Sequence, residues 1–127
     1  MRVLIADDSE VLVERLATTL TKVIGIEAAG RAGPGEATLK ATRKLKPDVL
    51  ILDICMPGGS SIAALDRMRA DEFAPAIIVL TNFSFSRYTK QRLQKDAKYV
   101  LDKSTEFEKV SEVLKRLISA GMSIAAA

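Results

Sequence analysis

The sequence predicts a doubly wound α/β fold, in which five helices cover both faces of a parallel five-stranded β-sheet. Short apolar runs without polar alternation, typical of strands buried on both faces, occupy residues 2–6, 48–53 and 76–80. Segments with apolar residues at helical spacing separate these runs, so strands and helices alternate along the chain. This alternation favours βαβ units with right-handed crossovers, which place helices on both faces of the sheet.

Length and composition limit the organisation of the chain. Its 127 residues suffice for one domain, which we expect over 1–121, followed by a short tail over 122–127 that is too short to fold. The 19 basic and 16 acidic residues give a net charge of +3, too small and scattered an excess to indicate nucleic-acid binding. The lack of histidine excludes the usual zinc sites and histidine-dependent nucleophiles. A single cysteine and the lack of a membrane-spanning run predict a cytoplasmic protein without membrane contact.

The first helix is expected directly after the strand at 2–6. It begins at Glu10, with Asp8 or Ser9 as its N-cap, and ends at Gly25. Its apolar positions recur at helical spacing: Val13, Leu16, Ala17, Leu20, Val23 and Ile24.

The next elements lead to the centre of the sheet. A weaker strand at 26–32 passes through a Gly-Pro-Gly turn at 33–35 into a helix that Pro47 closes. The strand at 48–53 is a continuous run of leucine and β-branched residues, which predicts the central strand.

The second half of the chain repeats the alternation. Helices are expected at about 61–70 and 86–95, with a strand at 76–80 between them and another at 99–101. Thr105 and Glu108 form a capping box for the last helix. The buried face of that helix is formed by Val110, Val113, Leu114, Leu117 and Ile118.

Polar side chains follow four of the five predicted strands. Asp7 and Asp8 come after the first strand, Asp53 ends the third, Thr81 ends the fourth and Lys103 follows the fifth. Ligands of doubly wound sheets bind at the carboxyl ends of the strands, where these residues would meet. Carboxylates gathered there repel each other unless a cation joins them, and Mg²⁺ prefers such oxygen ligands. With Mg²⁺ and Lys103 neutralising the cluster, an Asp53 oxygen could attack a phosphoryl donor.

This set of residues resembles the receiver domain of two-component response regulators, over essentially the whole chain. The matching motifs stand in the order of the family: Asp7-Asp8, Asp53, Met56-Pro57-Gly58-Gly59, Thr81 and Lys103. The resemblance implies a flavodoxin-like sheet with strand order 2-1-3-4-5.

The resemblance also implies a role for each site residue. Asp53 would be the phosphorylated aspartate. A Mg²⁺ cofactor would be held by Asp8 and Asp53 directly, by Asp7 through water, and by the backbone carbonyl of Cys55. Thr81 would hydrogen-bond the phosphoryl group on activation, and Lys103 would pair with it.

The function implied is that of a stand-alone phosphoryl-accepting switch in a bacterial two-component phosphorelay. The donor is a phosphohistidine on a sensor histidine kinase or a histidine phosphotransfer domain, because the chain itself has no histidine. The switch would act by binding a downstream protein or by passing the phosphoryl group on. It is not expected to be an enzyme beyond catalysing its own phosphorylation and dephosphorylation.

Two surfaces are candidates for partner binding. Val11 and Leu12 lie outside the apolar stripe of the first helix, and we expect them to contact the kinase or phosphotransfer domain. Receiver domains signal from the fourth helix, fifth strand and fifth helix, which here carry Arg87, Lys90 and Val100.

The chain departs from the family pattern at three places. Val100 stands where the family usually carries the Tyr or Phe of its aromatic switch, with Tyr99 one position away. Ser104 follows the lysine, where proline is common, and the end of the fourth helix at 95–97 has no glycine.

Other interpretations stay open. Val100 and Ser104 motivate a phosphorylation-independent adaptor, and the chain could also be the excised receiver of a longer DNA-binding regulator. A metal-dependent aspartyl phosphatase is less favoured, because Cys55 stands where such enzymes carry a second acid. Taken alone, Asp7 and Asp8 could simply cap a helix.

Overall fold

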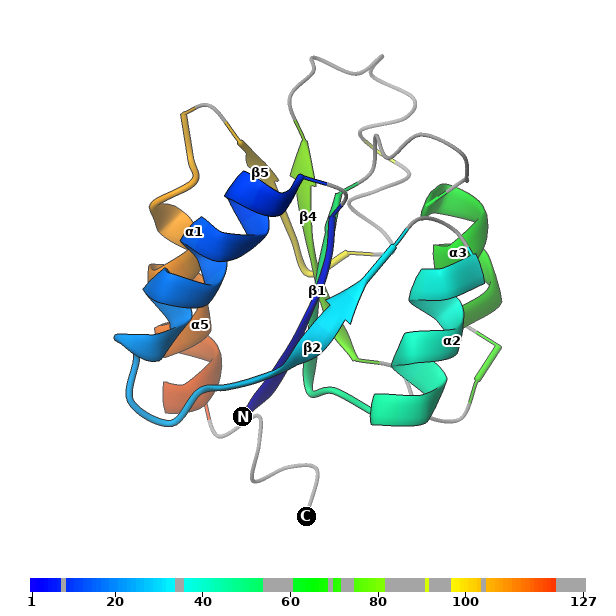
Figure 1. Ribbon diagram of the computed structural model, residues 1–127, viewed down its shortest axis with the longest axis horizontal. Helices are drawn as coiled ribbons and strands as arrows, with labels where there is room; N and C mark the ends of the chain where they lie inside the picture. Colours follow the sequence, from blue (N-terminus) through cyan, green and yellow to red (C-terminus); the bar gives the residue numbers. More distant parts are fainter. Residues whose placement is uncertain are drawn as a thin grey trace.

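The computed structural model describes residues 1–7, 9–33, 36–53, 61–68, 70–71, 75–81, 91, 97–103 and 105–120. Within these residues, five strands form one parallel sheet in the order β2-β1-β3-β4-β5 (Figure 1). The strands are β1 (Arg2–Ala6), β2 (Glu27–Ala32), β3 (Val49–Asp53), β4 (Ala76–Thr81) and β5 (Tyr99–Asp102). The predicted doubly wound parallel sheet and its strand order are confirmed.

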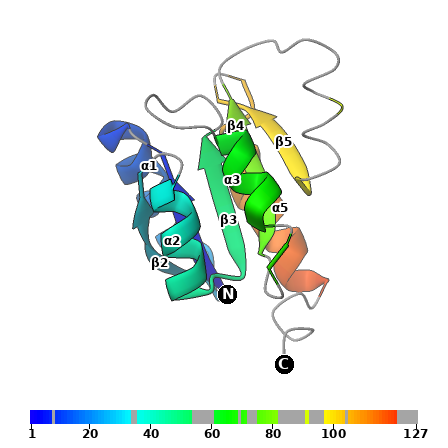
Figure 2. The same cartoon turned by 90° about the vertical axis from the view of Figure 1, so that its right-hand side faces the viewer.

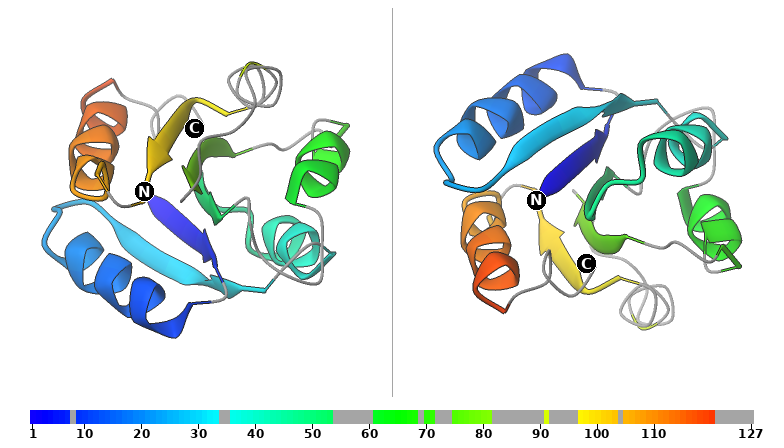
Figure 3. Two further views of the ribbon diagram at one scale, coloured as in Figure 1. Left: turned by 90° about the horizontal axis from the view of Figure 1, so that it is seen from above. Right: turned by 90° about the horizontal axis from the view of Figure 1, so that it is seen from below.

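Four helices cover the sheet in the described part of the chain: α1 (Glu10–Thr21), α2 (Glu36–Leu45), α3 (Ser61–Met68) and α5 (Lys109–Ser119). α1 and α5 lie on one face and α2 and α3 on the other, as the views from the side (Figure 2) and along the strands (Figure 3) show. The described residues thus contain four of the five expected helices. Most of the segment 86–95, predicted as the fourth helix, and the tail at 122–127 lie outside the described residues. No helix among the described ranges is long and apolar enough to cross a membrane.

Each face of the sheet has its own apolar core, because successive side chains of a strand point to opposite faces. Val3 and Ile5 of β1 belong to the cluster under α1 and α5. Leu4 of β1 belongs to the cluster under α2 and α3, together with Leu39 and Leu65. All residues of β3 are buried, as the apolar run at the sheet centre predicted.

The end of α1 differs from the prediction. The helix ends at Thr21 rather than at Gly25, and Ile24, which was assigned to its apolar stripe, is 95% exposed. Gly25 instead forms the turn into β2 with a φ of +92°, a value that side chains rarely allow. The amino-terminal ammonium of Met1 donates a hydrogen bond of 2.6 Å to the Gly25 carbonyl, which fixes this turn against the start of β1.

The start of α5 also differs from the prediction. The helix begins at Lys109 with Glu108 as its N-cap, so Thr105 is not the N-cap and the expected capping box of Thr105 and Glu108 does not form. Two other side-chain-to-backbone hydrogen bonds form just before the helix. Asp102 Oδ1 accepts a hydrogen bond from the Thr105 amide (3.2 Å), and Glu106 Oε1 accepts one from the Asp102 amide (3.2 Å). We refer to this arrangement as the 102–106 turn.

The end of α2 gives a test of local backbone strain. Lys46, directly after the helix, has a φ of +46°, in the left-handed region where glycine carries no steric cost. We expect Lys46→Gly to raise the free energy of unfolding by about 1 kcal/mol, because glycine relieves this strain. Lys44→Gly, at an exposed position in the last turn of α2, should lower it by about 1 kcal/mol instead. Urea unfolding measures both, and a destabilised Lys46→Gly variant would contradict the strain.

Candidate functional site

The carboxyl ends of four adjacent strands bring four predicted residues to one edge of the sheet, the carboxyl edge. Asp7 directly follows β1, Asp53 ends β3, Thr81 ends β4 and Lys103 directly follows β5. The strands β1, β3, β4 and β5 are consecutive in the sheet. Parallel pairing in register therefore aligns their ends, with Asp53 opposite Leu80 and Thr81 opposite Asp102.

Lys103 joins the two carboxylates at this edge. Its Nζ lies 2.8 Å from Asp7 Oδ2 and 3.1 Å from Asp53 Oδ2. The side chains of Lys103, Asp7 and Asp53 are 11%, 2% and 6% exposed, so the charges meet in a site that is largely shielded from water. Two carboxylates against one ammonium leave this Asp7–Lys103–Asp53 cluster one negative charge in excess.

The surroundings keep Lys103 charged. Burial by itself lowers the pKa of Lys103, but its contacts with Asp7 and Asp53 outweigh burial and raise the pKa above the ordinary value. The ammonium is therefore the stable form at neutral pH. The backbone is held as well, because the Lys103 amide donates a hydrogen bond of 2.8 Å to the Thr81 carbonyl.

Asp7 connects the cluster to α1. Its Oδ1 accepts a hydrogen bond of 2.9 Å from the amide of Ser9, the N-cap of α1, and the Ser9 hydroxyl accepts one from the Leu12 amide. Its Oδ2 is fully buried and forms an ion pair with the Lys103 ammonium. Within the described structure, this oxygen accepts no hydrogen bond of regular geometry. A buried carboxylate oxygen in this state has capacity for a further cationic partner.

The donor set of the carboxyl edge suits a hard cation. Asp7 and Asp53 offer carboxylate oxygens, and the predicted further ligands, Asp8 and the Cys55 carbonyl, lie outside the described residues. Among the residues that are described, no third acidic, cysteine or histidine side chain joins Asp7 and Asp53. Oxygen ligands alone, with one buried oxygen lacking a regular hydrogen bond, fit Mg²⁺ rather than a thiolate- or imidazole-bound metal.

The residues predicted for partner binding are dispersed. Val11 is 70% exposed on α1, whereas Leu12 is half-buried and packs against the core under α1 and α5. Val100 is half-buried against the opposite core, under α2 and α3. Arg87 and Lys90 lie outside the described residues.

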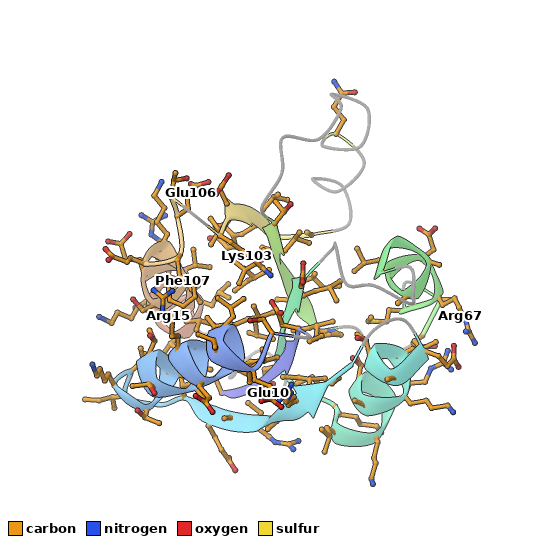
Figure 4. All side chains as sticks on the ribbon, turned by 45° about the horizontal axis from the view of Figure 1, so that its top comes forward. Glu10, Arg15, Arg67, Lys103, Glu106 and Phe107 are labelled. Atoms are coloured by element: carbon orange, nitrogen blue, oxygen red, sulfur yellow. The ribbon has the colours of Figure 1, made fainter. Side chains whose placement is uncertain are left out.

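Sequence reasoning missed a groove beside the carboxyl edge. The Arg15 guanidinium lies over the Phe107 ring, 4.4 Å from its centroid, and joins α1 to the segment before α5 (Figure 4). A groove of about 490 Å³, here called the α1 groove, is lined by Val11, Glu14, Arg15, Thr18, Thr19, Phe107 and Glu108. A smaller pocket of about 390 Å³ shares Arg15 and Phe107 and reaches Lys103. No sequence pattern pairs residues so distant along the chain.

Comparison with known proteins agrees with this geometry. The sequence matches the response regulator receiver domain over residues 3–115, and the chain therefore belongs to this family. The fold is similar to the signal receiver domain of the putative response regulator NarL from Mycobacterium tuberculosis. That structure has a TM-score of 0.77 and 29% identity, with 90% of this chain and 93% of that chain covered.

Two curated relatives are longer than this chain. The response regulator GacA from Pseudomonas viridiflava is 27% identical over 121 residues, which cover 95% of this chain and 56% of GacA. The protein-glutamate methylesterase/protein-glutamine glutaminase 2 of Anaeromyxobacter dehalogenans is 35% identical over 82 residues, which cover 65% of this chain and 24% of that protein. The chain thus spans about half, or less, of the length of these relatives.

The charge balance of the cluster can be tested through stability. We expect Lys103→Met, without added Mg²⁺, to lower the free energy of unfolding by about 3 kcal/mol, because it leaves two buried carboxylates without their cation. Asp53→Asn should change it by less than about 1 kcal/mol, because Lys103 keeps Asp7 as its partner. Urea unfolding at neutral pH measures both, and equal stability of Lys103→Met and the wild type would contradict the bridging role of Lys103.

Proposed function

We propose that this receiver domain is a phosphoryl-accepting signalling switch in which Asp53 takes the phosphoryl group from a phosphohistidine. The donor would be a sensor histidine kinase or a histidine phosphotransfer domain. The observation that supports this function most strongly is the Lys103 ammonium, which lies within 3.1 Å of both Asp7 and Asp53 at the carboxyl edge. An ammonium beside the acceptor carboxylate can compensate part of the negative charge of a phosphoryl group transferred there.

The transfer follows from the chemistry of these side chains. An Asp53 carboxylate oxygen attacks phosphorus and forms a phosphorus–oxygen bond, while the phosphorus–nitrogen bond breaks and its electron pair stays on the imidazole of the donor. Lys103, held by its amide to the Thr81 carbonyl, keeps its ammonium next to Asp53 and compensates the charge on the transferred oxygens. Thr81 ends the neighbouring strand, where its hydroxyl would hydrogen-bond the phosphoryl group.

Mg²⁺ fits this centre as a cofactor. Asp7 and Asp53, with Asp8 and the backbone carbonyl of Cys55, would hold the ion, and the buried Asp7 Oδ2 supports this assignment. The bound ion would supply positive charge that neutralises the carboxylates and the phosphoryl oxygens. Residues of this chain position the acceptor, and turnover of an external substrate is not part of the proposed activity.

Partner binding would use the α1 groove. Val11 is exposed there, and the groove adjoins the pocket that reaches Lys103, so a helix of the phosphodonor protein bound in it would lie near Asp53. Leu12, by contrast, serves the core more than the surface. The response would pass to a downstream protein or to a further phosphotransfer partner. The longer relatives favour, as an alternative, the same switch within a longer regulator.

Intact-mass spectrometry after incubation with acetyl phosphate tests the proposal. We expect wild-type protein to gain one phosphoryl group in the presence of Mg²⁺ and none when the metal is chelated. Asp53→Asn should gain none, because an amide oxygen is a poor nucleophile. Asp66→Asn, at an exposed aspartate of α3, is the matched control and should be labelled like the wild type.

Two outcomes would contradict the proposal. Labelling of Asp53→Asn would place the acceptor elsewhere. Folded wild-type protein that stays unlabelled in every condition would favour a phosphorylation-independent adaptor instead.

A further inference from the structure

The backbone that carries Lys103 lies at the edge of the sheet. Among the described strands, β5 is the last of the sheet and pairs with β4. The Lys103 amide faces β4, where it donates to the Thr81 carbonyl. Because successive amides of a strand point in opposite directions, the Asp102 amide faces the open side, where the sheet offers it no acceptor.

Glu106 supplies that acceptor. Its Oε1 accepts the hydrogen bond of the Asp102 amide (3.2 Å), and its own amide donates to the Asp102 carbonyl (2.8 Å). Asp102 Oδ1 closes the same turn by accepting from the Thr105 amide. These hydrogen bonds of the 102–106 turn hold Asp102, the residue next to Lys103.

Glu106 also attaches this turn to α5. Its second carboxylate oxygen lies 2.9 Å from Lys109 Nζ, in the first turn of the helix. The hydrogen bond from Lys109, followed by that from the Asp102 amide, lowers the pKa of Glu106, so the carboxylate stays ionised at neutral pH. Val110 and Leu114 of α5 are fully buried in the core. One side chain thus ties the end of β5 to a helix that the core holds in place.

We propose that Glu106 is a positioning residue for Lys103: through the Asp102 amide it fixes the backbone from which Lys103 reaches Asp7 and Asp53. This inference rests on the proposed phosphoryl-accepting role of Asp53. The ammonium stands 2.8 and 3.1 Å from two carboxylates, so a small displacement of its backbone lengthens both contacts. Misplacement of a catalytic charge by about 1 Å reduces rates substantially.

Three variants separate the hydrogen bond from the surface charge. Glu106→Ala removes the acceptor for the Asp102 amide. Glu106→Gln keeps an oxygen acceptor but loses the ion pair with Lys109, which is largely exposed and contributes little by itself. Glu112→Ala is the matched control, because Glu112 is an exposed acidic residue in the first turn of α5 and has no ion pair with a described residue.

The experiment measures the rate of labelling by acetyl phosphate and Mg²⁺, together with amide hydrogen exchange. We expect Glu106→Ala to be labelled about tenfold more slowly than the wild type, whereas Glu106→Gln and Glu112→Ala keep rates within about twofold. Exchange at the Asp102 amide should accelerate in Glu106→Ala alone, while the Leu114 amide, which reports on overall stability, stays protected. If Glu106 only stabilised the fold, hydrogen exchange would accelerate at both amides in Glu106→Ala.

Three results would overturn the inference, and they differ in meaning. Equal labelling rates for Glu106→Ala and the wild type would show that the turn does not position Lys103, with the proposed function intact. Equally slow labelling of Glu106→Ala and Glu106→Gln would show that the effect comes from loss of the ion pair with Lys109. A wild type that is not labelled at Asp53 would remove the proposed function and this inference with it.

Discussion

The contact of one ammonium with two carboxylates is the constraint on which the carboxyl edge depends. Asp7 and Asp53 are almost completely buried, and side by side they would repel each other strongly without a cation. Lys103 offsets this repulsion, and its raised pKa reflects the same contacts. The cluster still carries one excess negative charge, which favours binding of a further cation such as Mg²⁺. The ion pair thus serves the folded state and the proposed chemistry together.

The sheet explains why this contact forms. Asp7 directly follows β1, Asp53 ends β3 and Lys103 directly follows β5, and the order β1-β3-β4-β5 brings these carboxyl ends to one edge of the sheet. Two apolar clusters, one on each face, hold the strands in register. The packed strands therefore hold the Asp7–Lys103–Asp53 cluster in place. At the edge of the sheet, the hydrogen bonds of the 102–106 turn hold the backbone next to Lys103. The free energy of apolar burial in the core thus stabilises the strand positions that hold these charged side chains in place.

Most of the fold was predictable because the strands at 2–6, 48–53 and 76–80 are continuous apolar runs, a strong local signal. The candidate site followed from the general rule for strand ends in such sheets. The ends of two helices were not predictable, since tertiary contacts decide them. Met1 fixes the turn at Gly25, so α1 ends early. Likewise, the Glu106 side chain accepts a hydrogen bond from the Asp102 amide, and α5 begins only at Lys109. The stacking of Arg15 on Phe107 leaves no trace in local sequence.

A crystal structure with Mg²⁺ and beryllofluoride, a tetrahedral mimic of the phosphoryl group, tests the acceptor centre most directly. We predict beryllium bound to a carboxylate oxygen of Asp53, with fluorine atoms within hydrogen-bond distance of Lys103 Nζ and Thr81 Oγ1. Lys103 would then exchange its contact with the Asp53 carboxylate for one with the bound group. Beryllofluoride bound elsewhere, or an Asp53 carboxylate that still pairs with Lys103 at saturating reagent, would contradict a phosphoryl-accepting centre at this edge.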